Sequence, residues 1–252
     1  YDTMYTDPNY RGPKLIHPKY GPVDWMTDEE LQYVRGLYAG EVTFVDRWFG
    51  RFIDRLRELN LLDESLVILV SDHGHPHGDH GTIMKSAPNL YSELVKVPFM
   101  VRFPEKKYAG KRVDAIAQFV DIAPTILDFL DFTGSLEVMQ GKSLLPLIRS
   151  EVESIREVAQ IGVFKYDDRC IRDKDWSYMR RPEGMGDELY NLKEDPKETR
   201  NLIETHRKEA KRLVEKLGIP FQLRGPKVSS IQMKYDDIEG CAKRFEPVIS
   251  RV

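Results

Sequence analysis

The sequence predicts an α/β domain followed by a small antiparallel sheet and a helix. The first observation is a run of five apolar residues, Leu66 to Val70. A short apolar run without alternation is typical of a strand buried on both faces, as in a parallel sheet. The second is a long amphipathic helical pattern before that strand. The third is a change near residue 155 to short alternating stretches. We therefore expect an α/β part over residues 1–150 and a second part over residues 151–252.

The helix before the strand has a clear beginning. Residues 1–26 are rich in proline, glycine and tyrosine and are expected to form a connection. Thr27 is suited to cap the helix, and Glu30 completes a capping box. Apolar residues then recur at helical spacing, which predicts that one face is core. This face comprises Leu31, Val34, Tyr38, Val42, Val45, Trp48, Phe49, Phe52, Leu56 and Leu59.

The chain after the strand alternates between short elements. Residues 89–95 are expected to form a short helix. Val97 to Phe103 is a second apolar strand, and Pro98 and Pro104 within or beside it favour an edge or chain-end position. Asp121 is expected to cap a further helix that has Pro124 in its first turn.

The second part reads as an antiparallel meander. Its expected strands are Val158 to Phe164, Arg169 to Ile171, Trp176 to Met179, and Glu188 to Tyr190. A polar helix is expected from about Glu198 to Leu217, where Gly218 and Pro220 would end it. The remaining residues, 221–252, show little periodicity and are expected to form a surface tail.

Composition narrows the class of protein. The chain has 252 residues, of which 41% are hydrophobic and 31% charged, with a net charge of −3. This balance gives no reason to expect a nucleic-acid partner. No apolar run approaches the roughly 20 residues that a membrane helix needs. The two cysteines, Cys170 and Cys241, do not make a disulfide framework. The chain starts at Tyr1 in a loop-like stretch, which favours the middle of a longer protein.

Candidate metal-binding and catalytic side chains come directly after the apolar strand. Asp72 and His73 come at its end, where open α/β sheets place their ligands. A carboxylate with an imidazole suits Ca²⁺, Mg²⁺ or Mn²⁺ if other carboxylates join, or Zn²⁺ if other histidines join. Lys85 is a point charge suited to a sulfate or phosphate group. A metal and a lysine around one anion would stabilise developing negative charge.

Each of these residues also has a purely structural interpretation. Asp72 could cap a turn, His73 could be a satisfied polar residue, and a lone lysine is usually solvated. His75 and His77 flank a proline and are expected to be exposed in the loop. His80 is intermediate between these cases, because the neighbouring Asp79 could fix its tautomer.

Several motifs follow one another along the chain. They are residues 38–42 with Asp46, Leu66 to Gly74, Gly78-Asp79-His80-Gly81 followed by Lys85, Val97 to Arg102, Asp121 to Leu127, Gly141 to Pro146, and Glu188 to Leu192 with Asp195-Pro196, Glu198 and Asn201-Leu202. In this order and spacing they resemble the sulfatases of the alkaline phosphatase superfamily, and the resemblance spans most of the chain, to about residue 205. It implies a partial alkaline-phosphatase-like mixed sheet flanked by helices, followed by the small antiparallel sheet and helix.

The resemblance also implies roles for individual residues. Asp72 and His73 would bind the divalent cation, which is usually Ca²⁺ in this family. Lys85 would hold a sulfate oxygen near the nucleophile. His75, His77 and His80 lie where members contact substrate, and His80 is the strongest candidate of the three. Members carry either asparagine or histidine where this chain has His73, and histidine also occurs in phosphonate and phosphodiester hydrolases.

One part of the family's pattern is missing. The nucleophile of sulfatases is a formylglycine made from Cys or Ser in a Cys/Ser-x-Pro-x-Arg motif. Neither Cys170 nor Cys241 is followed by this pattern. We therefore expect the nucleophile, the paired N-terminal aspartates and a His-x-Pro segment upstream of Tyr1.

These observations predict a sulfate ester hydrolase that needs the full-length parent, so that the 252 residues alone would be inactive. The expected substrate is a sulfated small molecule or glycan, with no nucleic-acid or membrane partner. Self-association of this piece through exposed apolar surface is a further expectation. The sequence does not set a location, and the resemblance implies only that members of the family are usually extracytoplasmic. The alternatives are a phosphonate monoester or phosphodiester hydrolase, and a non-catalytic structural or binding module.

Overall fold

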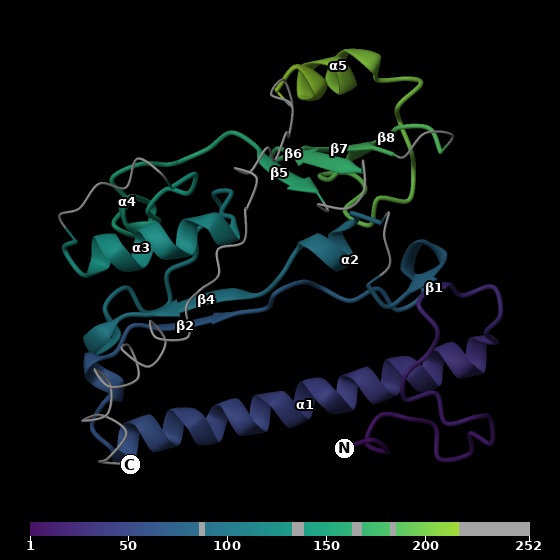
Figure 1. Ribbon diagram of the computed structural model, residues 1–252, viewed down its shortest axis with the longest axis horizontal. Coiled ribbons are helices and arrows are strands. Elements are labelled where there is room, and N and C mark those ends of the chain that lie inside the picture. Colours follow the sequence, from purple (N-terminus) through teal and green to yellow (C-terminus); the bar gives the residue numbers. More distant parts are fainter. Residues whose placement is uncertain (86–88, 133–138, 163–167, 182–184, 217–252) are drawn as a thin grey trace, which may run out of the picture. The chain divides into compact units, whose positions relative to one another are not determined.

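The structure is a computed structural model that describes residues 1–85, 89–132, 139–162, 168–181 and 185–216. These residues belong to one compact unit, Tyr1–Gly218. Helices and strands both occur along this unit, so the α/β fold class is confirmed (Figure 1). The expected tail over 221–252 and Cys241 lie outside the described residues. The expected boundary near residue 150 stays a prediction.

Helix α1, Asp28–Glu58, begins as the capping box predicts. The backbone N–H of Glu30 donates to the Thr27 hydroxyl at 3.2 Å, and the Thr27 N–H donates to the Glu30 carboxylate at 2.7 Å. These two bonds satisfy donors that the first turn of a helix otherwise leaves free. The N-terminal segment crosses α1 at Gly36 and Gly40, where a Cβ atom would meet the carbonyl oxygens of Tyr5 and Tyr1.

The expected core face of α1 is wrong over most of its length. Val34 is buried, but Val45 is 60% exposed and Trp48 is 49% exposed. Val42 and Phe52 are exposed as well. Helical spacing identifies residues that share a face, whereas burial of that face depends on another element packing against it. Among the described residues, α1 keeps an open apolar stripe from Val42 to Phe52.

Strand β2, Val67–Val70, pairs with strand β4, Phe99–Arg102, in antiparallel register, with Leu69 opposite Met100. The parallel, fully buried environment expected for this strand is therefore wrong in the described sheet, where all four residues of β2 are only half-buried. An apolar run predicts a strand but does not determine the direction of its partner. The edge character expected for the second strand agrees with a sheet of two described strands.

The segment between β2 and β4 folds back on itself. Strand β3, Thr82–Ile83, pairs with strand β1, Gly21–Pro22, so the N-terminal connection contacts the histidine-rich loop. Helix α2, Ser92–Val95, lies within the range expected for a short helix. The loop is thus held between the N-terminal connection and α2, directly after β2.

The C-terminal meander is confirmed over the described residues, whereas residues 163 and 164 of its first expected strand and residues 217–220 at the expected helix end lie outside them. Strands β5, Ala159–Gly162, β6, Arg169–Arg172, β7, Trp176–Arg180, and β8, Glu188–Asn191, form one antiparallel sheet in chain order. Two buried clusters lie on this sheet. One contains Leu90, Tyr91, Cys170, Met179 and Tyr190, and the other contains Ile171, Tyr178, Leu189, Ala210 and Leu213. Consecutive residues of β6, and of β7, enter different clusters, as the two-residue period of a strand requires.

Helix α5, Arg207–Lys216, packs through Ala210 and Leu213 against the second cluster. The expected start at Glu198 is wrong by nine residues: Glu198 lies in a turn with φ 54° and is 1% exposed. The polar composition concealed a turn stabilised by Asp195, whose carboxylate accepts from the Arg200 N–H at 2.8 Å. Such local bonds compete with helix formation.

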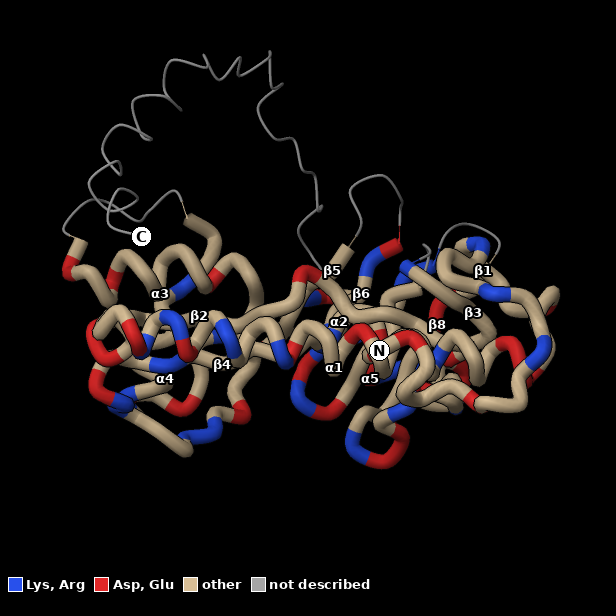
Figure 2. Tube along the Cα trace, turned by 90° about the horizontal axis from the view of Figure 1, so that it is seen from below, with Lys and Arg blue, Asp and Glu red and all other residues tan. Residues whose placement is uncertain are grey.

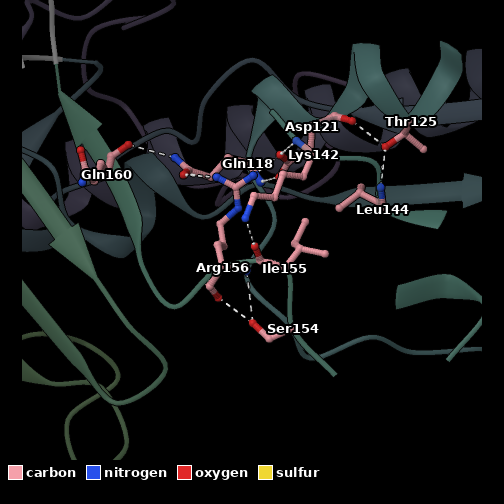
Figure 3. A network of polar contacts seen from close by, with 9 residues as sticks. All are labelled: Gln118, Asp121, Thr125, Lys142, Leu144, Ser154, Ile155, Arg156 and Gln160. Atoms are coloured by element: carbon pink, nitrogen blue, oxygen red, sulfur yellow. Dashed lines mark hydrogen bonds and ion pairs between the residues drawn. The ribbon is translucent and has the colours of Figure 1, made fainter. Parts of the chain in front are cut away.

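Asp121 is fully buried before helix α3, Ile122–Phe129. Its side chain does not cap α3, contrary to expectation. It accepts from the Gln118 N–H at 2.8 Å and the Lys142 N–H at 2.9 Å, and it pairs with Arg156 (Figure 3). The carboxylate therefore joins the start of α3 to the segments on either side of helix α4, Leu145–Ile148.

Charged residues of both signs are interspersed along the described elements (Figure 2). The distribution matches the small net charge of the sequence. No helix in the described part of the chain combines the length and apolar character needed to cross a membrane.

Candidate functional site

Asp72 and His73 follow the end of β2 in a turn that the chain stabilises locally. The His73 N–H donates to Asp72 Oδ1 at 3.0 Å, and the Ser71 hydroxyl donates to the His73 carbonyl at 2.8 Å. The side chain of Asp72 is 81% exposed, and that of His73 is 30% exposed. Both side chains therefore remain open to a ligand while their backbone is fixed.

The hydrogen bonds of His73 favour one tautomer of its neutral ring. Nδ1 lies 2.7 Å from the Gly74 carbonyl oxygen, which only accepts hydrogen bonds. The proton of a neutral ring is then on Nδ1, and the lone pair is on Nε2. Nε2 lies 3.3 Å from Asp72 Oδ2. A lone pair and a carboxylate oxygen on neighbouring residues suit a divalent cation, and a carbonyl bond on the second nitrogen is the usual support for a metal-bound histidine.

Two ligands do not complete a metal site. Across the described ranges, no three His, Cys, Asp or Glu side chains are grouped closely enough to hold an ion. Ca²⁺ takes six to eight oxygen ligands. Asp72 and His73 therefore fit a cation only if other groups or water supply the remaining positions.

The loop after His73 closes into a hairpin. The Gly78 N–H donates to the Thr82 carbonyl at 2.7 Å, and the Met84 N–H donates to the Pro76 carbonyl at 3.1 Å. The Met84 sulfur also lies 2.9 Å from His75 Nε2. The chain leaves at His75 and returns to it at Met84, one residue before Lys85.

Lys85 is exposed and electrostatically close to this turn. Burial lowers the pKa of His75 and the charge of His73 lowers it further, whereas Glu41 raises it and Lys85 lowers it by the smallest of these effects. Both ends of the hairpin thus influence the same imidazole. The hairpin returns the chain at Met84 to His75, and Lys85, twelve residues after His73, comes directly after Met84.

His75 and His77 are half-buried, so the expectation that they are exposed loop residues is wrong. Their rings stack with centroids 4.9 Å apart, and the Tyr38 ring lies 4.2 Å from that of His77. Burial, with the charge of His75 as a smaller cause, lowers the pKa of His77 to about 4. Neither ring nitrogen of His77 has a hydrogen-bond partner among the described residues. His77 is therefore a neutral packing group at neutral pH.

His80 has partners other than the expected Asp79. Its Nδ1 lies 2.6 Å from Glu93 Oε1, and its Nε2 lies 2.9 Å from the Glu198 carbonyl oxygen. Asp79 instead accepts from the His77 N–H at 3.2 Å. The ring of His80 stacks on Tyr91 with centroids 3.6 Å apart. Its substrate-binding role stays a prediction, and both ring nitrogens are already engaged.

Sequence reasoning missed Glu93, Glu198 and Arg172 as neighbours of the loop. The Glu198 carboxylate pairs with Arg172 of β6 at 2.7 Å and accepts from the Ser92 N–H at 2.7 Å. Glu93 lies in a region that is expected to form a short helix. Its spacing of 13 residues from His80 gives only a weak indication that the two side chains meet. Glu198 lies 118 residues from His80, and no local pattern could connect them.

Two family models match the chain. One, described as sulfatase, matches residues 7–132, and the other, described as N-sulphoglucosamine sulphohydrolase, C-terminal, matches residues 78–220. The two matches overlap at the hairpin and together include every candidate residue of the site.

Individual relatives agree with these matches. An N-acetylglucosamine-6-O-sulfatase of Bacteroides thetaiotaomicron is 29% identical over 79% of this chain and 35% of its own length. A structure solved with its substrate D-glucosamine-2-N,6-O-disulfate has 26% identity and a TM-score of 0.67, over 77% of this chain and 42% of that one. A phosphonate monoester hydrolase of Agrobacterium radiobacter has 28% identity and a TM-score of 0.63, over the same shares. The chain thus spans well under half the length of these relatives.

Proposed function

The chain belongs to the sulfatase family of the alkaline phosphatase superfamily, and from this premise we propose that the protein containing it hydrolyses sulfate esters. The observation that supports this most is the hairpin of residues 75–84, which returns the chain to His75 at Met84, the residue before Lys85. A cation and an ammonium group would then face one tetrahedral anion.

Each residue has a role in this proposal. Asp72 Oδ2 and His73 Nε2 would hold a divalent cation, with Ca²⁺ as the first expectation and Mg²⁺ or Mn²⁺ as alternatives. When bound, such a cation supplies positive charge to the sulfate oxygens. Lys85 would donate to a sulfate oxygen and offset the negative charge that develops as the ester bond breaks. The Gly74 carbonyl keeps the His73 ring oriented.

The nucleophile is proposed to be a formylglycine that precedes Tyr1 in the parent protein. Cys170 does not fit this role: its side chain is fully buried, and burial raises the pKa of its thiol to about 11. It packs with Tyr91 and Met179 instead. We therefore propose that the 252 residues alone do not turn over sulfate esters.

We take sulfated amino sugars as the first substrate class to test. The reason is that the relatives include an N-acetylglucosamine-6-O-sulfatase and a structure solved with glucosamine disulfate. This chain covers only 35% and 42% of the length of those two proteins.

The experiment starts with the gene upstream of Tyr1, where a Cys/Ser-x-Pro-x-Arg motif is expected. The protein that includes it would then be assayed with 4-nitrophenyl sulfate and with glucosamine 6-sulfate. Lys85→Ala should abolish most turnover, whereas Lys96→Ala, at an exposed lysine nearby, should not. Absence of the motif together with absence of turnover would contradict the proposal and favour a non-catalytic module.

A second candidate is hydrolysis of phosphonate monoesters or phosphodiesters. The similarity to the phosphonate monoester hydrolase of Agrobacterium radiobacter favours it. The two candidates share the metal pair and Lys85 and differ in the preferred central atom. Comparing kcat/KM for 4-nitrophenyl sulfate with that for 4-nitrophenyl phenylphosphonate on one preparation separates them.

A further inference from the structure

The His80 ring lies between two groups that can only accept hydrogen bonds. Nδ1 faces a carboxylate oxygen of Glu93, and Nε2 faces the backbone carbonyl oxygen of Glu198. A neutral imidazole carries one N–H, so one of these two contacts would lack a hydrogen. Only the doubly protonated ring satisfies both contacts. The geometry therefore favours a positively charged His80.

The surroundings of His80 stabilise that charge. The His80 and Glu93 side chains are 16% and 17% exposed. Tyr91 stacks on the ring, and Tyr91 in turn donates to Glu188 at 2.8 Å and lies under the Arg181 guanidinium. Arg172 pairs with the Glu198 carboxylate. Glu93 is the carboxylate in direct contact with the imidazolium, and Asp79 is exposed to solvent beside it.

His80 also connects three separate elements. Through Glu93 it holds α2, and through the Glu198 carbonyl it holds the turn after β8. The Glu198 carboxylate extends the connection to the Ser92 N–H and to Arg172 of β6. The imidazole of His80 therefore connects the C-terminal sheet to the hairpin.

The hairpin needs such a fastening. His80 and Met84 both adopt left-handed backbone conformations, with φ 47° and φ 63°. Non-glycine residues adopt this conformation only at a cost in free energy, so surrounding contacts must hold it. His80 is held by its two ring bonds, and Met84 by its contact with His75. Lys85 follows Met84 directly.

We propose that His80 is a positioning residue, whose charged ring fixes the hairpin between Glu93 and the Glu198 carbonyl and so sets the position of Lys85 at the site. This assigns the ring to scaffold rather than to substrate. The kinetic part rests on the proposed sulfate ester hydrolysis, whereas the charge state and the anchoring do not.

The electrostatics agree with this geometry. Burial opposes the charge on His80, but the hydrogen bonds to Glu93 and to the Glu198 carbonyl, with the negative charges of both residues, raise its pKa to about 8. The anchor should therefore be complete at pH 6.5 and lost as the pH rises through 8. Above that range the wild-type ring can keep only one of its two bonds.

The first test measures the ring directly, in the chain as it stands. Nitrogen-15 NMR of histidine-labelled protein should show both His80 nitrogens protonated at pH 7, with a midpoint above the ordinary 6.5. Glu93→Gln should move that midpoint downward, because it removes the carboxylate and keeps the shape. A neutral His80 at pH 7, or a midpoint unchanged in Glu93→Gln, would overturn the proposal.

The second test measures the consequence for the reaction, in the longer protein that contains this chain. His80→Gln should lower kcat/KM for 4-nitrophenyl sulfate by roughly ten- to a hundredfold at pH 7, as expected for a misplaced catalytic group. The deficit relative to wild type should shrink toward pH 9, where wild-type His80 is neutral as well. A role confined to shape would give a constant ratio, and that result would overturn the positioning role. His17→Gln, at an exposed histidine, is the matched control.

The two tests separate failure of this proposal from failure of the proposed function. If no ester is hydrolysed, the hydrolase assignment is wrong, and the NMR midpoint still decides the anchoring. If ester is hydrolysed and the His80→Gln deficit does not depend on pH, the assignment stands and the positioning role is wrong.

Discussion

Two buried carboxylate–arginine pairs in this chain look alike and behave differently. Asp121 pairs with Arg156, and Glu198 pairs with Arg172. Both carboxylate side chains are fully buried, and both bridge segments that are distant in sequence. Asp121 also accepts two backbone N–H groups, from Gln118 and Lys142. Its charge is thus balanced by groups that do not titrate near neutral pH.

The pair at Glu198 includes a titratable neighbour. The backbone carbonyl of the same residue accepts from His80, so the strength of this junction depends on an imidazole. It also contacts the loop that carries the candidate site, whereas the Asp121 pair joins α3 to residues 142–156. One neighbouring titratable group therefore decides whether the stability that a buried ion pair contributes depends on pH.

The largest effect on stability is expected at the Asp121–Arg156 pair, which has no neighbour that titrates near neutral pH. Asp121→Ala leaves the half-buried Arg156 without its carboxylate partner and two N–H groups without an acceptor, which should lower the free energy of unfolding by about 3–5 kcal/mol. The loss should be the same at pH 6.5 and pH 8.5. Urea unfolding at both pH values measures it, with Asp114→Ala at an exposed position as control. A loss that differs between these pH values would contradict the claim that the Asp121 pair, unlike the junction at Glu198, is independent of pH.

The next largest effect concerns catalysis. Lys85→Ala in the longer protein should reduce kcat/KM for an aryl sulfate by roughly a hundred- to a thousandfold, the usual consequence of removing one preorganised charge from a developing anion. Stability should change little, because Lys85 is exposed. Steady-state kinetics measures kcat/KM of the variant and of wild type, and urea unfolding measures their stability. Equal activity in the variant and in wild type would remove Lys85 from the site.

A smaller effect is expected at the pH-sensitive junction. The folded-state pKa of His80, about 8, exceeds its ordinary value of 6.5, so its contribution to stability is complete below pH 6.5. The contribution should amount to about 2 kcal/mol and disappear as the pH rises through 8. His80→Gln should therefore destabilise the chain at pH 6 and much less at pH 9. Urea midpoints across this range test the sign as well as the size.

The smallest effect provides a baseline away from both pairs. Thr27→Ala removes the N-cap of α1 and should cost about 1 kcal/mol at any pH between 6 and 9. Thr43→Ala, within the same helix, is the comparison for a loss of hydroxyl without a loss of capping. A Thr27→Ala cost as large as that of Asp121→Ala would mean that local capping rivals the buried pair.

Local sequence signals predicted local structure well. The capping box at Thr27 and Glu30 gave the start of α1, and the alternating stretches gave β5 to β8 in the right order. Both depend on residues close together in the chain. What surrounds an element was predicted poorly. The apolar run of β2 did not reveal its antiparallel partner, and the spacing in α1 did not reveal an open stripe.

The candidate site divides in the same way. Asp72 and His73 are adjacent, so their proximity needed no folding information. The return of Lys85 depends on a hairpin closed by Gly78 and Met84, which the sequence suggested only through resemblance to a family. The contact of His80 with Glu198 depends on packing between distant segments and was not predictable from local pattern.

The central claim is that Asp72 and His73 hold a cation beside an anion that Lys85 also contacts. The most direct test is aryl sulfate turnover by the longer protein after treatment with EDTA and after return of Ca²⁺, in wild type and in Asp72→Ala. We predict that wild type loses turnover with the chelator and recovers it with Ca²⁺, while Asp72→Ala stays inactive throughout. Turnover that survives both the chelator and the loss of the Asp72 carboxylate would contradict the claim.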